Sequence, residues 1–479
     1  MKARVLYLLV PIVIFTLAIT VSFIEPDTFY NRTLQHESTK DVQSYNLPMG
    51  AFSTHLPVVS VNTRSQRIPG GRLPGDVERY ELSEQGLSEI NVEVTFFGED
   101  AFVSDAMFRV RGNSSRLFEK KSYAMTFVEA DFTEKNIGIL GMEPDDNWAL
   151  HGPALDRTLL RNYLAMNLTG ELMPYAPDVR FVELFVNDQY EGVYVLMETV
   201  SKGEGRVNIP TPDRNSVMTS YIVEIDREAK LEFPLNDFLV DTYRLYPSAT
   251  DLTYPTDRQY TDARFDFVNR DFSKLAKNIY QIPYATEKNA YKDWIDETAF
   301  YDYFIINELF RNIDAGYYST YFYRHLRGKL TPVVWDFNNS LDNYQETVFD
   351  ETGFSMTQVV FYEQLLKEAR FVEGLIERYR NLRKSRLSDE RLITMVDDSI
   401  NYLGDAISRN NQRWDRYYDH EQYSPDDFLI PVERNPTTYN QAVNQMTTFL
   451  LARGQWLDEH IDALYQYSHP SRHSFESIK

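Results

Sequence analysis

The sequence predicts an α+β fold in which a strand-rich part precedes a helix-rich part, with an N-terminal membrane anchor in front of both. Three observations support this prediction. Residues 5–23 are apolar and carry no charge. Short β-branched and aromatic runs separated by turn signals occupy residues 57–204, and long amphipathic segments occupy most of residues 205–470. Residues 471–479 form a short tail.

The N-terminal segment, residues 1–24, predicts an uncleaved signal anchor. Lys2 and Arg4 precede an apolar run that is long enough to cross the hydrocarbon core, and their charge keeps the N-terminus in the cytoplasm. No small-x-small cleavage site follows directly, so an anchor is favoured over a cleaved signal peptide, which would leave the protein secreted. We therefore expect a single-pass cell-membrane protein that contacts the bilayer through this helix and exposes its domain outside the cytoplasm.

The composition excludes several classes of function. With 49 Lys and Arg against 71 Asp and Glu, the formal net charge is −22, and such a surface repels phosphate backbones, so we expect no nucleic-acid partner. The chain has no cysteine, which excludes disulfides, thiol nucleophiles and thiolate metal sites. Its 479 residues, 43% of them hydrophobic, exceed one ordinary domain and indicate two packed lobes or one enlarged domain.

The strand-rich part follows a polar, irregular stretch, residues 25–56, which predicts a linker between membrane and domain. Short runs rich in β-branched and aromatic residues are typical of strands, and turn signals such as Pro69-Gly70-Gly71 separate them. The expected strands lie at residues 58–61, 90–97, 107–110 and 123–127, in "VRFVELFVN" and "GVYVLMETV" around residues 187–192, and in "YIVEID" from Tyr221.

One helix interrupts the strand-rich part, and several helices close the chain. Residues 156–172 have an apolar face with Asp156 in the N-cap position, so we expect a helix there. Further helices are expected at residues 297–310, 361–387, 388–409 and 440–467. This order of elements indicates a small β lobe followed by a larger α lobe, with a cleft between them.

Two aspartates flank a predicted hairpin. Residues 319–325 and 329–335 are rich in aromatic and β-branched residues, and Arg327-Gly328 between them is typical of a turn. If the two segments pair, their outer ends lie about 5 Å apart. Asp314 leads into the hairpin and Asp336 leads out of it, so both carboxylates are expected to converge at one end.

Two converging carboxylates have three main uses. They run glycosidic acid–base chemistry, they hold Mg²⁺ or Ca²⁺, or one holds a metal while the other accepts a proton from an attacking hydroxyl in phosphoryl transfer. A hairpin between a loop aspartate and an Asp-Phe turn favours the third use. The alternative is that Asp314 caps a turn and Asp336 is a solvated strand end.

Several motifs occur in one order between residues 57 and 464, and their number and order resemble the spore coat protein H (CotH) kinases. This family contains atypical protein kinases that are often secreted or spore-associated. The motifs are "RGNSSRLFEKKSYAMTF" (111–127), "HGPALDRTLLRNYLA" (151–165), "FVNDQYEGVYVLMETV" (185–200), "VEID" (223–226), "NIDAGYYSTYFY" (312–323), "PVVWDFN" (332–338), "RNNQRW" (409–414) and "FLLARGQWL" (449–457).

The resemblance implies an atypical protein kinase-like fold of two lobes, a β-rich N-lobe at residues 57–204 and a helix-rich C-lobe at residues 205–470. It implies transfer of the γ-phosphate of ATP to Ser or Thr of surface or secreted proteins, with Mg²⁺ or Mn²⁺. Asp314 is then the catalytic base, and Asp336 is the main metal ligand.

The metal side departs from the protein kinase pattern. A kinase catalytic loop has Asn five residues after its Asp, to bind a second metal, and here that position is Ser319. The residue two after Asp336, an Asp in many family members, is Asn338. No His-Arg pair precedes Asp314. We therefore expect Asn338 and Ser319 to be weaker metal ligands.

The phosphate side has no Gly-x-Gly-x-x-Gly motif in the strand-rich part. Arg111, together with the amides and hydroxyls around Ser114 and Ser115, is expected to form an anion-binding nest. The alternative is an ordinary hairpin corner made of turn residues.

Further positions complete the expected nucleotide site. Lys121 is the candidate for steadying the α- and β-phosphates, with Lys120 as its rival. Arg161 and Asn162 lie off the apolar face of the expected helix, and they are expected either to serve the phosphates or to brace the lobe. Met197 and Glu198, in "LMETV", resemble an interlobe hinge that offers backbone groups to adenine, and the alternative is an ordinary edge strand.

Three other functions stay open. A non-catalytic surface adhesion or scaffold module (a pseudokinase) would tolerate Ser319 and Asn338. A kinase-fold enzyme that transfers AMP would use the same aspartates with the nucleotide reversed. A glycosidase would need acids about 5 Å or about 6.5–9.5 Å apart around a sugar groove, and an Asp-Phe turn is not its signature.

Overall fold

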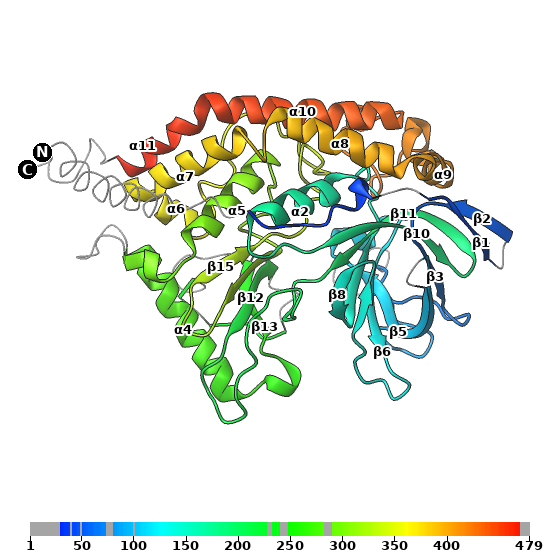
Figure 1. Ribbon diagram of the computed structural model, residues 1–479, viewed down its shortest axis with the longest axis horizontal. Helices are drawn as coiled ribbons and strands as arrows, with labels where there is room; N and C mark the ends of the chain where they lie inside the picture. Colours follow the sequence, from blue (N-terminus) through cyan, green and yellow to red (C-terminus); the bar gives the residue numbers. More distant parts are fainter. Residues whose placement is uncertain are drawn as a thin grey trace, which may run out of the picture.

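The computed structural model describes residues 29–38, 41–47, 50–72, 80–98, 101–227, 232–236, 238–239, 248–281 and 290–469. The predicted anchor at residues 5–23 and the tail at 471–479 lie outside these ranges. Among the described residues, no helix combines the length and the apolar character that a membrane span needs. The predicted α+β class is confirmed, because sheets and helices occupy separate regions of the molecule (Figure 1).

Seven of the described strands close into a barrel in the order β10-β11-β9-β6-β5-β4-β3. Neighbours are antiparallel except β10 and β3, whose parallel pairing closes the barrel. Alternate residues of each strand point inward, as Ile90, Val92 and Val94 of β4 do. The strands are β3 (Val58–Asn62), β4 (Ile90–Phe97), β5 (Phe102–Arg111), β6 (Ser122–Val128), β9 (Asn147–His151), β10 (Val179–Val186) and β11 (Gln189–Glu198).

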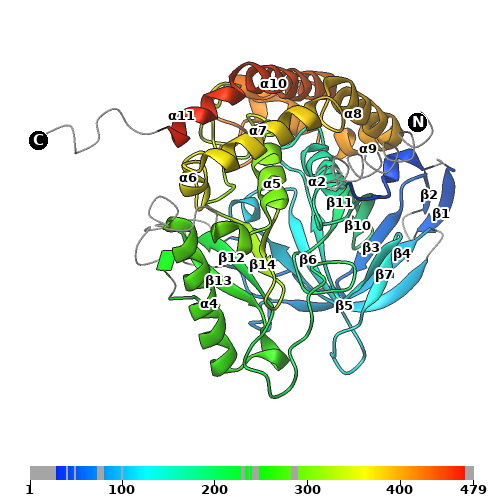
Figure 2. The same cartoon turned by 60° about the vertical axis from the view of Figure 1, so that its left-hand side comes forward.

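A second sheet lies beside the barrel and contains the predicted hairpin (Figure 2). Its order is β13-β12-β14-β15, with all neighbours antiparallel. The hairpin is confirmed, since Tyr321 faces Val333, although its strands are shorter than expected. The sheet strands are β12 (Tyr221–Arg227), β13 (Ser248–Tyr254), β14 (Thr320–Arg324) and β15 (Leu330–Val333). Two small hairpins are β1 (Gln43–Leu47) with β2 (Gly50–Thr54), and β7 (Ile137–Ile139) with β8 (Met142–Asp145).

Most helices gather on one side of the two sheets, with α7, α8 and α10 along the top of the view in Figure 1. The expected helix at residues 297–310 is confirmed as α5 (Glu297–Leu309), with the Asp296 side chain capping it. The segment predicted as one helix at 388–409 is broken at Gly404, which has a positive φ of 50°. The other helices are α2 (Arg161–Leu172), α4 (Asp262–Tyr280), α6 (Tyr362–Leu365), α7 (Ala369–Arg383), α8 (Asp389–Leu403), α9 (Asp405–Arg413), α10 (Tyr439–His460) and α11 (Tyr465–Ser468).

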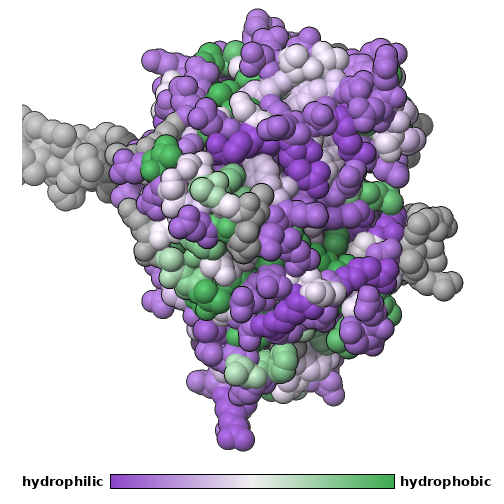
Figure 3. Space-filling view, turned by 90° about the vertical axis from the view of Figure 1, so that its right-hand side faces the viewer, coloured by the Kyte–Doolittle hydropathy of each residue, from purple (hydrophilic) through white to green (hydrophobic). Residues whose placement is uncertain are grey.

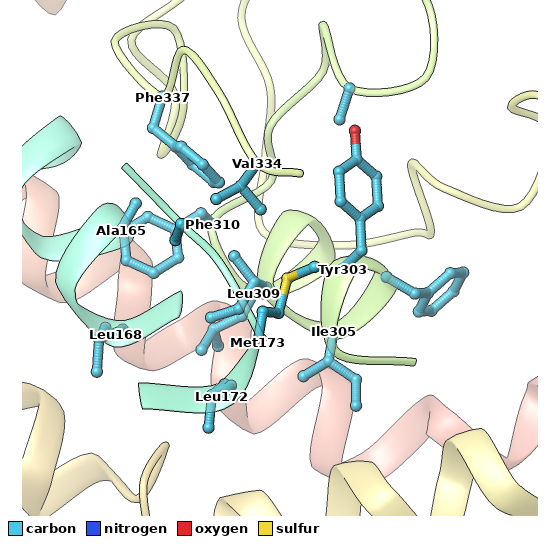
Figure 4. Packing of buried hydrophobic residues seen from close by; sticks show 14 of the residues in the cluster. Ala165, Leu168, Leu172, Met173, Tyr303, Ile305, Leu309, Phe310, Val334 and Phe337 are labelled. Atoms are coloured by element: carbon cyan, nitrogen blue, oxygen red, sulfur yellow. The ribbon is translucent and has the colours of Figure 1, made fainter. Parts of the chain in front are cut away.

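Helix α2 is buried along its whole length, and it begins at Arg161 rather than at the predicted Asp156. The Asp156 carboxylate is used one turn earlier, because it accepts hydrogen bonds from the backbone N–H groups of Thr158 at 3.1 Å and of Arg161 at 2.9 Å. Side chains of α2 and α5 pack together with Val334 and Phe337, which follow β15 (Figure 4). The hairpin exit is therefore anchored in the main hydrophobic core.

The N-terminal strap, residues 29–38, is docked on the fold, although the sequence predicts a linker there. The Arg32 guanidinium donates to the Asn167 side chain of α2 at 2.9 Å. The Gln35 side chain both donates to the carbonyl of Phe181 and accepts from its N–H, at 3.1 and 2.7 Å. These polar residues look like a spacer in the sequence, but they satisfy buried groups of other elements.

Hydrophilic side chains cover most of the face shown in Figure 3, which is the barrel side of the molecule.

Candidate functional site

A cleft of about 520 Å³ is lined by residues of both the barrel and the four-stranded sheet. The barrel side is basic: Arg109, Arg111 and Arg116 lie in β5 or just after it. The opposite side is mostly acidic: Glu224 and Asp226 come from β12, Asp314 comes from the loop before the hairpin, and Asp336 comes from the turn after it. Arg227, the last residue of β12, also lines this side. A cleft with a cationic wall and a mostly anionic wall suits a ligand whose negative charges are shared with a cation.

Asp314 and Asp336 both line this cleft, as the hairpin geometry predicts. Asn339, three residues after Asp336, donates to the Asp314 carboxylate at 2.7 Å. Asn312 donates to the backbone carbonyl of Asp336 at 3.4 Å. The loop before the hairpin and the turn after it are therefore joined by side-chain amides.

The two residues at the outer ends of the hairpin have strained backbones. Ser319 has a φ of 49° and Asp336 a φ of 56°, both in the left-handed region. For a residue such as serine this conformation costs about 1–2 kcal/mol, whereas aspartate adopts it more readily. Ser319 and Asn338 also line the cleft, so all four residues predicted for the catalytic and metal side are brought to it.

Arg109 and Arg111 lie two residues apart on β5 and therefore on one face of the strand. The Arg111 guanidinium lies 5.2 Å from the centre of the Trp335 ring, immediately before Asp336. Burial lowers the pKa of Arg111, while the neighbouring Tyr321 and Asp336 oppose this shift. The predicted phosphate-binding arginine and the predicted metal ligand thus influence each other across the cleft.

The turn after β5 brings Ser115 to the cleft, and it needs glycine at one position. Gly112 has a φ of 103°, and a Cβ there would come within 1.8 Å of the Ser115 hydroxyl oxygen. Ser115 donates to the Arg111 carbonyl at 3.4 Å. The side chain of Ser114, also predicted for the site, lies outside the part of the chain that the structure describes.

Neither predicted phosphate lysine lines the cleft. The Lys121 ammonium donates to the carbonyls of Arg116 and Leu117, at 2.8 and 3.4 Å. The Lys120 ammonium is buried elsewhere and donates to the Val193 carbonyl and the Asn410 side chain, both at 2.8 Å. Among the described residues that line the cleft, the strong cations are all arginines.

Arg161 and Glu198 also lie outside the cleft lining. Arg161 braces the fold: its guanidinium binds the Asp156 carboxylate at 2.6 Å and the Ser340 carbonyl at 3.0 Å. Glu198 accepts the N–H of Asp178 at 2.8 Å, and burial raises the pKa of Glu198 to about 7.

Met197 does line the cleft, but its strand is not an edge. Strand β11 has neighbours on both sides, and Met197 faces Val179 of β10 and Ala149 of β9. The backbone at Met197 therefore takes part in the strand pairing of the barrel on both sides.

Several cleft residues have no predicted role in the sequence. Glu224 and Asp226 alternate on β12, and Glu224 faces Tyr321 of the hairpin. The pKa of Tyr321 is raised well above its usual value, mainly because the hydroxyl is buried and next because the Glu224 carboxylate lies nearby. The period-two spacing of the two acids in "VEID" is the signal that predicts a shared face.

The oxygen donors of the cleft suit a divalent metal. The described residues include no group of three or more His, Cys, Asp or Glu side chains arranged to hold a metal by themselves. Mg²⁺, however, is usually bound through one or two carboxylates together with substrate phosphates. Asp336 and Asn338 fit a metal that is shared with a phosphate-bearing ligand.

Comparison with known proteins gives one finding. The family model described as CotH kinase protein matches residues 108–457, which is most of the chain and includes all the cleft residues discussed above. No curated protein matches the chain.

Proposed function

The chain belongs to the CotH kinase family, and from this premise we propose that it transfers the γ-phosphate of ATP to Ser or Thr side chains of surface or secreted proteins. The single observation that supports this proposal best is the cleft with arginines on one wall and Asp314 and Asp336 on the other. In this proposal the barrel is the N-lobe of a kinase-like fold, and the second sheet with the helices is the C-lobe.

Each side of the cleft has a role in the proposed reaction. Asp314 accepts the proton of the acceptor hydroxyl, and Asn339 holds its carboxylate in place. Asp336 and Asn338 hold Mg²⁺ or Mn²⁺. When bound, the metal neutralises charge that develops on the transferred phosphoryl group. Arg111 and Arg109 bind phosphate oxygens from the barrel side.

In this proposal Arg111, rather than Lys121, binds the phosphates of ATP. Arg111→Ala is expected to weaken ATP binding about 10-fold or more, because a hydrogen bond to a charged group contributes about 1.5–3 kcal/mol. Lys121→Ala is the matched control, since Lys121 does not line the cleft and its ammonium donates to the backbone carbonyls of Arg116 and Leu117. Isothermal titration with ATP and Mg²⁺ measures both. Stronger loss in Lys121→Ala than in Arg111→Ala would return the phosphate role to the lysine.

The transfer reaction is tested with the full chain, divalent metal and acidic model proteins as acceptors. Parallel incubations contain ATP labelled at the γ-phosphate or at the α-phosphate. Transfer of the γ-label alone supports a kinase, and transfer of the α-label identifies an AMP transferase. Absence of ATP binding would favour a non-catalytic adhesion or scaffold module.

We also propose that the domain is extracytoplasmic and held at the cell membrane by residues 5–23. The support is the uncharged run behind Lys2 and Arg4. Protease added to intact cells is expected to digest the domain and to leave a cytoplasmic control protein whole. Full protection of the domain, together with its digestion after lysis, would reject this orientation.

A further inference from the structure

The start of helix α2 holds the turn that carries Asp336. Asn162 is only 3% exposed, and its side-chain oxygen accepts the backbone N–H of Phe337 at 2.8 Å. The preceding residue, Arg161, donates to the carbonyl of Ser340 at 3.0 Å. Two consecutive side chains of α2 therefore bind both ends of the segment that follows Asp336.

His151 of β9 fixes the orientation of the Asn162 amide. Because the Asn162 oxygen faces the N–H of Phe337, its NH₂ group faces the Nε2 atom of His151, at 3.1 Å. This nitrogen accepts a hydrogen bond only when the ring is neutral. Burial lowers the pKa of His151 to about 4, so the ring is neutral near pH 7. His151 and Asn162 both line the cleft.

The backbone at Asp336 needs this support. Its φ of 56° lies in the left-handed region, which residues other than glycine adopt only uncommonly. The Phe337 ring is fully buried and packs edge-on against Phe310, with 5.5 Å between ring centres. With the ring fixed in the core and the N–H fixed by Asn162, the backbone on the C-terminal side of Asp336 has a single defined position.

We propose that Asn162 is a positioning residue, which keeps the Asp336 carboxylate in the cleft by binding the N–H of Phe337, with His151 setting the orientation of its amide. This inference rests on the proposed phosphoryl transfer, in which Asp336 holds the metal. Loss of a residue that orients a metal ligand typically lowers metal affinity or activity about 10–100-fold. Loss of Asn162 is therefore expected to change the metal dependence more than the stability of the fold.

The test compares Asn162→Leu with Asn167→Leu in the full chain. Asn167 is a matched control, because it is a fully buried asparagine of the same helix whose side chain binds the strap residue Arg32, outside the cleft. Thermal stabilisation by Mg²⁺ or Mn²⁺ is titrated in the presence of a non-hydrolysable ATP analogue. Asn162→Leu is expected to need about 10-fold or more metal for half of the effect, and Asn167→Leu is expected to match the parent.

A second variant, His151→Phe, covers the case in which Asn162→Leu does not fold. It removes the acceptor of the amide and is expected to shift the metal titration in the same direction by a smaller factor. The same metal dependence in parent, Asn162→Leu and His151→Phe would overturn the inference, as would an equal shift in Asn167→Leu. If the parent binds metal and nucleotide but transfers nothing, the proposed function fails while the titration still decides this inference. If metal does not stabilise the parent at all, both fail.

Discussion

Asp314→Ala is expected to lower the rate of phosphoryl transfer about 10²–10⁴-fold, the usual effect of losing a positioned base. Binding of ATP is expected to stay within about twofold of the parent, because this carboxylate acts on the acceptor hydroxyl rather than on the nucleotide. Transfer is measured with γ-labelled ATP, and binding is measured by calorimetry. The two measurements together distinguish a variant that binds ATP but does not transfer phosphate from a variant whose nucleotide site is disrupted.

A matched control for Asp314→Ala is Asp350→Ala. Asp350 is an exposed-loop carboxylate that accepts hydrogen bonds from Thr352 and does not line the cleft. The Asp350→Ala variant is expected to transfer phosphate at the same rate as the parent. Equal transfer by Asp314→Ala and the parent would rule out the proposed mechanism.

Asp336→Asn is expected to abolish both transfer and the metal-dependent part of ATP binding. The substitution keeps the size of the side chain and tolerates the left-handed backbone, since asparagine is enriched there. It removes the negative charge that would bind the metal and that faces Arg111. Thermal stabilisation by ATP is measured with and without Mg²⁺, and in this variant the metal is expected to add nothing.

The control for this substitution is Asp342→Asn. Asp342 also has a φ of 56°, but its carboxylate binds Arg434 at 2.9 Å and lines a different cavity. The Asp342→Asn variant therefore makes the same Asp-to-Asn change, at a residue with the same left-handed backbone, but outside the cleft. If metal stabilises Asp336→Asn with ATP as strongly as it stabilises the parent, another residue is the main metal ligand.

The hairpin with its two aspartates is readable from the sequence because its information is local. Alternating aromatic and β-branched residues and a Gly-containing turn specify the pairing. The pairing brings the loop with Asp314 and the turn with Asp336 to one end of the hairpin, where both line the cleft. Local patterns likewise predict six of the seven barrel strands, whereas β9 (Asn147–His151) is absent from the strands that the sequence predicts. Barrel closure is different, because the parallel contact joins Val58 to Glu183, and no local pattern specifies such a distant pair.

The direction of a lysine side chain is an example of what sequence reasoning cannot supply. Lys120 and Lys121 are adjacent and chemically identical in the sequence. Which way each points is decided by distant partners, such as the Asn410 side chain that binds Lys120 from helix α9. For Asn162 the sequence predicts a role at the phosphates or in bracing the lobe, but it does not predict the partners, because His151 and Phe337 come together with Asn162 only in the folded chain.

The docked strap has a consequence for how far the domain stands from a bilayer. As a free linker, residues 25–56 would allow a separation of up to about 110 Å from the proposed anchor, at 3.3–3.6 Å per extended residue. Because the fold already binds the chain at Arg32 and Gln35, only the few residues from 24 to about 29 remain to span the gap, which is at most about 20 Å. For an anchored chain, the distance between the cleft and the lipid surface is then limited by the size of the domain rather than by the length of a linker.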